Sequence, residues 1–320
     1  MIGTAITFIV GAGGSCNYGL PSANRLRREA ETLDPSSALY RTLVGAKIPD
    51  ECIEQVKLEL RADRLAPSID VFLEARRHRP ECMQVGRALT AILLGDVIAR
   101  TRGANRPEKG DWLGWLLARM RQGTSSLAQF LDGNKQVRFV TFNFDSRIEE
   151  RLAQELRAMY PDAPPADFER ARHQFAVVHV HGRLPDPPTV RLTVDSVWNG
   201  VSPDWINWLS QAASEVKVVH DDIDQSIVEQ ARQAVRQAYD LCFLGFGYGP
   251  ENVQRLDIAG AVNDTSKNPR VFGSAYGVTA GDLLLAKSRL TGNRASDRIT
   301  LGRRDGDCLS LLEDFYVCRD

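Results

Sequence analysis

The sequence lacks a dominant charge and a long hydrophobic run. Its 320 residues carry a formal net charge of −1, so no global electrostatic attraction to nucleic acid is expected. The longest apolar runs, Ala5 to Val10 and Leu241 to Phe246, are far too short to cross a bilayer. We therefore expect a cytoplasmic protein that does not contact nucleic acid directly and does not bind membranes.

Paired cysteines are also missing, because none of the six cysteines forms a CxxC motif. That motif is the usual signature of a structural zinc site, so no zinc is expected. In a reducing compartment, isolated cysteines are more often buried apolar residues than disulfide partners. His179 and His181 are two positions apart and share a strand face. No third ligand has suitable spacing, so we predict no metal site.

The composition, with 43% hydrophobic and 25% charged residues, is typical of a globular protein large enough for one or two domains. Short apolar runs alternate with helical periodicity from Val137 onward, which predicts a doubly wound parallel sheet of Rossmann-like α/β type. The expected strands are Ala5 to Val10, Val137 to Phe142, Phe175 to His181, Leu241 to Phe246, Val271 to Ser274 and Ile299 to Leu301.

Between the first strand and Lys135 the apolar spacing is almost entirely helical. Ser22 is a plausible N-cap, and four further segments follow, at Asp50 to Asp63, from Pro67-Ser68, around Val85 to Val97, and at Trp112 to Met120. We therefore expect a Rossmann-like domain of residues 1–21 and 136–320, with residues 22–135 as a large helical insertion. Asp162 to Glu169, which has three prolines inside it or just before it, is predicted to be a surface loop.

The first strand runs without a break into the glycine-rich segment Gly11-Ala12-Gly13-Gly14-Ser15, which is followed by Gly19-Leu20-Pro21. Such a turn lies at the carboxyl edge of a parallel sheet, where glycines let backbone N–H groups approach a diphosphate. Neither common nucleotide motif is complete. Cys16 stands where the dinucleotide pattern needs a third glycine, and no GK[ST] triplet follows.

Three other strand ends are also polar or rich in glycine. These are Asn143 to Asp145, His179 to Gly182, and Gly245 to Gly249. Because ligands of open α/β sheets bind at the carboxyl edge, we expect these segments and the glycine-rich turn to share one pocket.

The spacing GAGxSxxxGxP, formed by Gly11-Ala12-Gly13, Ser15, Gly19 and Pro21, resembles the opening motif of sirtuins and sirtuin-like NAD-consuming proteins. Val140 to Asp145 is similar to the sirtuin T-Q-N-x-D segment, and Val180-His181-Gly182 to the catalytic histidine-glycine pair. Gly245-Phe246-Gly247, with Asn252, resembles the GFGF-type turn of bacterial sirtuin-like NAD hydrolases.

The resemblance implies that NAD is the substrate. Asn143 would hold the nicotinamide ribose and the attacking water, and His181 would act as a base or as a partner of a ribose hydroxyl. Asp145 would shape the nicotinamide pocket. The remaining residues expected to bind NAD are Gly11, Ala12, Gly13, Ser15, Gly19 and Pro21 around the diphosphate, and Gly245, Phe246, Gly247 and Asn252 on the adenosine side.

Two departures from the sirtuin pattern affect the expected reaction. The zinc-ribbon cysteines are missing, and Ser22, Ala23 and Asn24 stand where deacylating sirtuins carry Asp-Phe-Arg. The chain is therefore closest in pattern to the NAD hydrolases of bacterial anti-phage defence. We expect an NAD glycohydrolase gated by homo-oligomerisation or by a partner defence protein. An NAD-dependent protein deacylase, and a sensor that binds NAD or ADP-ribose without turnover, stay open as alternatives.

Each site residue also has a purely structural interpretation. Asn143 or Asp145 could cap a helix that starts near Ser146, and His181 could be a structural histidine. The cationic run Arg76 to Arg79 could bind a partner, but such a run is more often the solvated face of a helix.

Overall fold

The computed structural model describes residues 2–103, 107, 109–192, 201–217, 224–294 and 297–315. Its contacts divide the chain into two compact units. Unit 1 comprises Met1–Asn17, Asn105–Val180 and Asp224–Asp320, and unit 2 comprises Tyr18–Ala104 and His181–Ile223.

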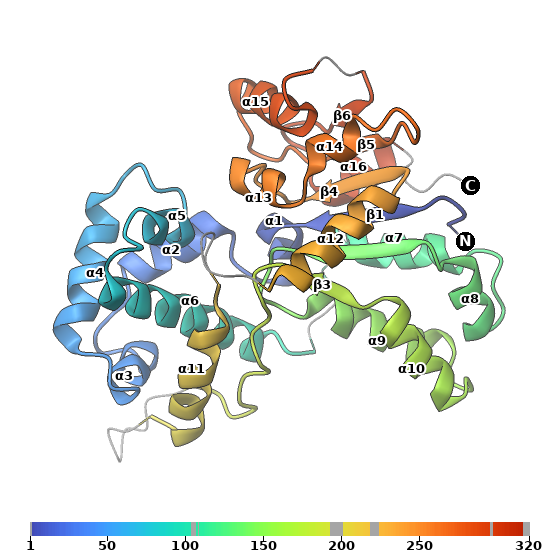
Figure 1. Cartoon of the computed structure of the whole chain (residues 1–320). Helices are drawn as coiled ribbons and strands as arrows, with labels where there is room; N and C mark the ends of the chain where they lie inside the picture. The colour runs from blue at the N-terminus through green and yellow to red at the C-terminus, as the bar shows by residue number, and fades with distance from the viewer. Residues whose placement is uncertain are drawn as a thin grey trace. The chain divides into compact units, whose positions relative to one another are not determined.

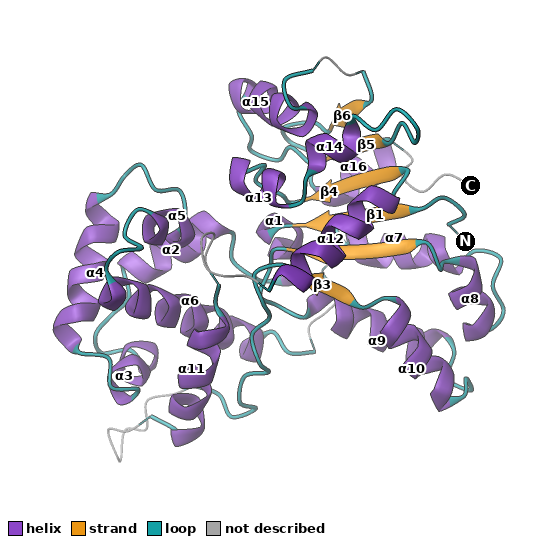
Figure 2. Cartoon of the chain, in the orientation of Figure 1, coloured by secondary structure: helices purple, strands orange, loops and turns teal. Residues whose placement is uncertain are grey.

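Unit 1 is built on a six-stranded, all-parallel sheet with the strand order β3-β2-β1-β4-β5-β6 (Figures 1 and 2). This order confirms the predicted doubly wound, Rossmann-like fold, with a long helical segment between β1 and β2. The strands are β1 (Ile6–Val10), β2 (Val137–Thr141), β3 (Val177–His179), β4 (Asp240–Leu244), β5 (Arg270–Gly273) and β6 (Ile299–Leu301).

The central strands are apolar because both of their faces are covered. Every residue of β1 and of β4 is buried, as expected for parallel strands between two layers of helices. In the register of the sheet, Val10 pairs with Thr141 on one side and with Leu244 on the other. The segments that follow β1, β2 and β4 therefore start from the same edge.

Helices of unit 1 cover the sheet. α12 (Gln225–Gln237) contacts β2 and β3, and the Thr7 hydroxyl of β1 donates to the Ala234 carbonyl at 2.8 Å. In Figure 2, α12 crosses in front of the strands and α7 (Trp112–Arg121) lies behind them. The other helices of unit 1 are α1 (Ala12–Ser15), α8 (Leu127–Gly133), α9 (Arg147–Met159), α10 (Pro165–Gln174), α13 (Pro250–Arg255), α14 (Ile258–Val262), α15 (Ala280–Thr291) and α16 (Cys308–Asp314).

Unit 2 is helical, and α6 (Pro80–Arg100) forms its core. By length and composition alone α6 could cross a membrane, but 72% of its apolar window is buried inside the structure. It contacts α2, α3, α4, α5 and α11, as the central helix of a folded bundle does. Those helices are α2 (Ala23–Glu31), α3 (Ala38–Gly45), α4 (Asp50–Ala62), α5 (Ile69–Glu74) and α11 (Pro203–Glu215), and the short 3-10 turn η1 (Cys16–Tyr18) precedes α2.

The limits of the two units differ from those expected for the helical insertion. α7 and α8 belong with the sheet, while residues 181–223 join the helices of unit 2. One reason is Trp112, which is buried in unit 1 and whose indole N–H donates to the Gly14 carbonyl at 2.8 Å. That contact attaches the start of α7 to the glycine-rich turn.

Local helix signals explain most of the helix boundaries. The Ser22 hydroxyl accepts from the Arg25 amide and caps α2, as predicted. Ser68 caps α5 in the same way. The loop predicted for Asp162 to Glu169 is wrong, because α10 begins inside it at Pro165. Proline is tolerated in the first turn of a helix, where its missing N–H has no partner to lose.

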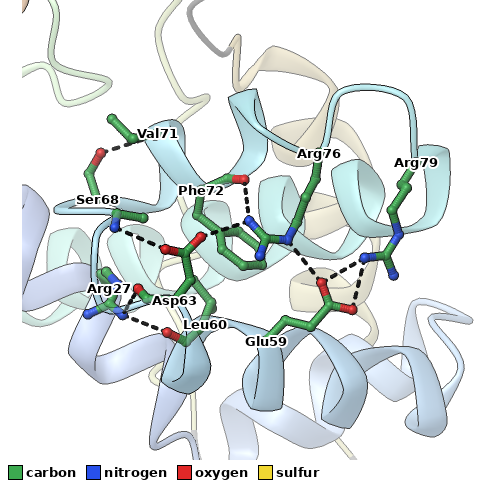
Figure 3. A network of polar contacts seen from close by, with 10 residues as sticks. Arg27, Glu59, Leu60, Asp63, Ser68, Val71, Phe72, Arg76 and Arg79 are labelled. Atoms are coloured by element: carbon green, nitrogen blue, oxygen red, sulfur yellow. Dashed lines mark hydrogen bonds and ion pairs between the residues drawn. The ribbon is translucent and has the colours of Figure 1, made fainter.

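The cationic run Arg76 to Arg79 lies in the turn between α5 and α6 rather than on a helix. Two of its arginines, Arg76 and Arg79, bind acidic side chains of α4 and the residue after it (Figure 3). Arg76 contacts Glu59 and Asp63 at 2.9 Å each, and Arg79 contacts Glu59 at 2.7 Å. Hydrogen bonds from Arg79 lower the pKa of Glu59 to about 2 despite partial burial. Arg76 and Arg79 therefore join α4 to the α5–α6 turn.

Candidate functional site

The glycine-rich turn after β1 packs directly against the turn after β4. The Gly11 amide donates to the Leu244 carbonyl and the Gly13 amide to the Gly245 carbonyl, each at 3.0 Å. Gly245 has a φ of +59°, and a Cβ there would lie 1.8 Å from the Gly14 nitrogen. These two turns can touch only because both consist of glycine at the contact. The backbone N–H groups of Gly11 and Gly13 thus form hydrogen bonds with carbonyl groups of the protein itself.

The rest of the turn after β4 is less closely packed at Gly247 than at Gly245. A Cβ built on Gly247 meets nothing within 4 Å, so packing within the structure does not require glycine there. Phe246 is buried and its ring lies 5.3 Å from those of Phe142 and Phe243. Asn252, near the start of α13, has a buried Oδ1 to which none of the described residues donates a hydrogen bond.

Asn143, directly beyond β2, is held through almost all of its polar groups. Its backbone amide donates to the Thr141 hydroxyl at 3.0 Å, and its carbonyl lies 3.0 Å from His179 Nδ1. Its side-chain Nδ2 donates to the Gly11 carbonyl at 3.0 Å and to Ser15 Oγ at 2.9 Å. The side-chain Oδ1 is buried and has no hydrogen-bond partner in the described part of the chain.

The orientation of this amide follows from its neighbours. A backbone carbonyl can only accept, so the nitrogen and not the oxygen of the Asn143 side chain must face Gly11. The remaining group, Oδ1, is therefore a fixed acceptor. Leaving a buried acceptor unpaired costs about 1–3 kcal/mol, which a ligand donor would recover. Asn143 does not cap α9, and Ser146 occupies the N-cap position.

Ser15 connects Asn143 to Asp145. Its hydroxyl accepts from Asn143 Nδ2 and donates to Asp145, at 3.0 Å to Oδ2 and 3.3 Å to Oδ1. Asp145 also accepts from the Arg147 amide at 3.1 Å, so it satisfies the first turn of α9. Loss of hydration on burial raises the pKa of Asp145, although both of these hydrogen bonds favour its ionised form. Asp145 thus accepts hydrogen bonds both from the first turn of α9 and from Ser15, and Ser15, Asn143 and Asp145 form one polar cluster.

A His179–Glu149 pair behind Asn143 was not predicted from the sequence. His179 Nε2 lies 2.7 Å from Glu149 Oε1, while Nδ1 contacts the Asn143 carbonyl. With both ring nitrogens engaged, His179 is neither a free base nor an available metal ligand. Within the described part of the chain, no group of three His, Cys, Asp or Glu residues could hold a metal ion. The sequence indicated His179 only as the start of the polar strand end His179 to Gly182 and by its spacing from His181.

Gly19, Pro21 and His181 belong to unit 2. Gly19 has a φ of +87°, and Pro21 is buried just before the N-cap of α2. His181 is buried, and its carbonyl accepts from the Lys217 amide at 3.3 Å. The structure thus brings together Gly11, Gly13, Ser15, Asn143, Asp145 and Gly245 within unit 1. The pairing of His181 with Asn143 stays a prediction.

Unit 2 contains a cavity of about 440 Å³ bordered by α6 and α11. Its lining is mostly apolar, from residues such as Ile48, Met83 and Leu209, with Arg87 and two serines among the polar groups. None of the site residues predicted from the sequence lines this cavity.

The chain matches no protein-family model, and no curated protein shows significant sequence similarity to it. The resemblance to sirtuin-like proteins therefore depends on the motif residues alone.

Proposed function

We propose that this chain is an NAD glycohydrolase that cleaves NAD to nicotinamide and ADP-ribose. The proposal depends above all on Asn143, whose buried Oδ1 is the one polar atom of that residue that has no hydrogen-bond partner among the described residues. A ribose hydroxyl or a water molecule is a donor and can pair with this acceptor, whereas a phosphate oxygen cannot. A fixed hydrogen-bond acceptor beside a glycine-rich strand end can therefore bind a ribose hydroxyl.

The position of the cluster supports a nucleotide ligand. In the observed order, β1 lies between β2 and β4. The chain runs from β1 through β2 to β3 on one side of the sheet and then crosses to β4, β5 and β6 on the other side. Ligands of open α/β sheets bind at such switch points, outside the carboxyl ends of the strands. Asn143 follows β2, Ser15 follows β1 and Gly245 follows β4.

The reaction needs few groups. The bond between C1′ of the ribose and the pyridinium nitrogen breaks, and its electron pair stays with the nitrogen, so nicotinamide leaves neutral. A water oxygen then bonds to C1′ and loses one proton. Positive charge builds up on the sugar as the bond breaks, and positioned acceptors and carboxylates stabilise it. Asn143 Oδ1 would orient the sugar or the water, Asp145 would border the nicotinamide, and His181 would take the proton.

An enzyme that consumes NAD without control would kill its own cell. We therefore propose that activity is gated by self-assembly or by a partner protein, as expected for bacterial anti-phage defence, with residues 22–135 as the contact region. The reaction itself consumes a soluble nucleotide and needs neither nucleic acid nor membrane.

Incubating the pure protein with NAD and following free nicotinamide by chromatography tests the proposal. Release from NAD alone supports the hydrolase. Release only with an added acyl-lysine peptide supports the deacylase alternative, and binding without release in every assembled state supports the sensor. The assay is repeated with the products of neighbouring genes, because gating can silence the isolated chain.

A further inference from the structure

We propose that His179, anchored by Glu149, is a positioning residue that fixes Asn143 for catalysis. This inference rests on the proposed NAD hydrolysis and extends it, because it assigns a role to a residue that contacts no substrate. The three residues come from different elements of unit 1: His179 ends β3, Asn143 follows β2, and Glu149 lies in α9.

The imidazole is held at both ends. Nδ1 lies 3.0 Å from the Asn143 carbonyl oxygen, and Nε2 lies 2.7 Å from Glu149 Oε1. The side chain of His179 is only 9% exposed. The ring therefore cannot turn without breaking a contact at one end.

The protons on this ring follow from its partners. A backbone carbonyl only accepts, so Nδ1 of His179 carries a hydrogen and donates to Asn143. Nε2 lies within hydrogen-bond distance of Glu149 Oε1, at 2.7 Å. Since Glu149 Oε2 is buried and no described residue donates a hydrogen bond to it, His179 is the anchor of that carboxyl as well.

The consequence for Asn143 is geometric. Thr141 holds its amide, Gly11 and Ser15 hold its side-chain nitrogen, and His179 holds its carbonyl. Releasing the carbonyl lets the peptide plane turn and moves Oδ1. A displacement of about 1 Å of a group that aligns the substrate can cost on the order of 100-fold in rate.

Two conservative substitutions separate the contacts of His179. In His179→Asn, the amide nitrogen takes the place of Nδ1, so the contact to Asn143 is kept and that to Glu149 is lost. In His179→Gln, the longer amide takes the place of Nε2, so the contact to Glu149 is kept and that to Asn143 is lost. His173→Ala replaces an exposed histidine of α10 and is the control.

We expect His179→Gln to lower kcat about 10- to 100-fold with KM changed by less than about threefold. We expect His179→Asn to keep kcat within about threefold of the wild type, although its Tm falls because Glu149 loses its partner. Activity that simply follows Tm across the variants, or a kcat for His179→Gln equal to that for His179→Asn, overturns the proposal.

Hydrogen exchange followed by mass spectrometry tests the same point without NAD. Peptides covering residues 141–147 should exchange faster in His179→Gln than in His179→Asn and His173→Ala. Equal exchange in all of these variants contradicts the positioning role. If the wild type cleaves no NAD in any assembled state but the exchange difference is present, the NAD hydrolase proposal fails and the positioning of Asn143 stands.

Discussion

Ser15 Oγ lies 2.9 Å from Asn143 Nδ2, and this contact joins the glycine-rich turn after β1 to the end of β2. The same hydroxyl donates to Asp145. One serine thus links the amide proposed to bind the ribose with the carboxyl proposed to border nicotinamide.

Ser15→Ala removes that link. Asn143 Nδ2 loses an acceptor and Asp145 loses a donor, so we expect a loss of about 1–3 kcal/mol in the free energy of unfolding, measured by urea denaturation. NAD cleavage should fall as well, because Asn143 is held less firmly. Ser210→Ala, which removes an exposed hydroxyl on α11, should change the stability by no more than about 0.5 kcal/mol. Equal stability of the two variants would refute the link.

Gly247 and Gly245 should respond differently to alanine. Gly245→Ala is expected to fold poorly, because its Cβ meets the Gly14 nitrogen and its φ is positive. Gly247→Ala has open space around the added methyl group, so its Tm should stay within about 2 °C of the wild type. If NAD lies against this turn, Gly247→Ala raises KM. An unchanged KM in a folded Gly247→Ala protein would place NAD elsewhere.

Asp145→Asn should raise Tm at neutral pH. Burial raises the pKa of this carboxyl above its ordinary value of 3.8, so the ionised form is less stable in the folded protein than in the unfolded chain. That cost is present well above the ordinary pKa and disappears below it, where both states are protonated. Calorimetry at several pH values should therefore show a gain in Tm near pH 7 that shrinks toward about pH 4. A gain that is independent of pH would point to another cause.

Glu59 is expected to make unit 2 sensitive to acid. Its pKa is lowered from 4.5 to about 2 in the folded protein, so its contribution to stability is complete above about 4.5 and is lost as pH falls toward 2. Glu59→Gln should cost about 1.5–3 kcal/mol at pH 7 and should flatten the fall in Tm between those pH values. Glu51→Gln, at an exposed position of α4, is the control and should leave that fall unchanged.

Much of the fold could be predicted from the sequence. Buried parallel strands such as β1 and β4 are unbroken apolar runs, and α12 has a strong amphipathic period with the observed limits Gln225 and Gln237. α10 was missed because prolines usually end a helix, although Pro165 here begins one. α3 and α8 were also missed, since each is only two turns long and its apolar period is correspondingly short.

The candidate site was predictable only in part. The strand ends that carry Ser15, Asn143 and Gly245 could be recognised because polar and glycine residues interrupt apolar runs there. The contacts of His179 with Asn143 and Glu149 could not, since they join residues 36 and 30 positions apart whose spacing carries no local signal. The union of residues 181–223 with the helices of unit 2 is equally non-local, because it depends on packing between α11 and α6.

The most direct measurement compares nicotinamide release by Asn143→Ala and Asn263→Ala in an assembly in which the wild type is active. Each substitution removes an amide nitrogen that makes two hydrogen bonds to the protein, so the two should lose similar stability. We predict that Asn143→Ala loses at least about 100-fold in kcat while Asn263→Ala keeps nearly all of it. Release by a folded Asn143→Ala protein at the rate of Asn263→Ala would contradict the assignment of Asn143 as the catalytic centre.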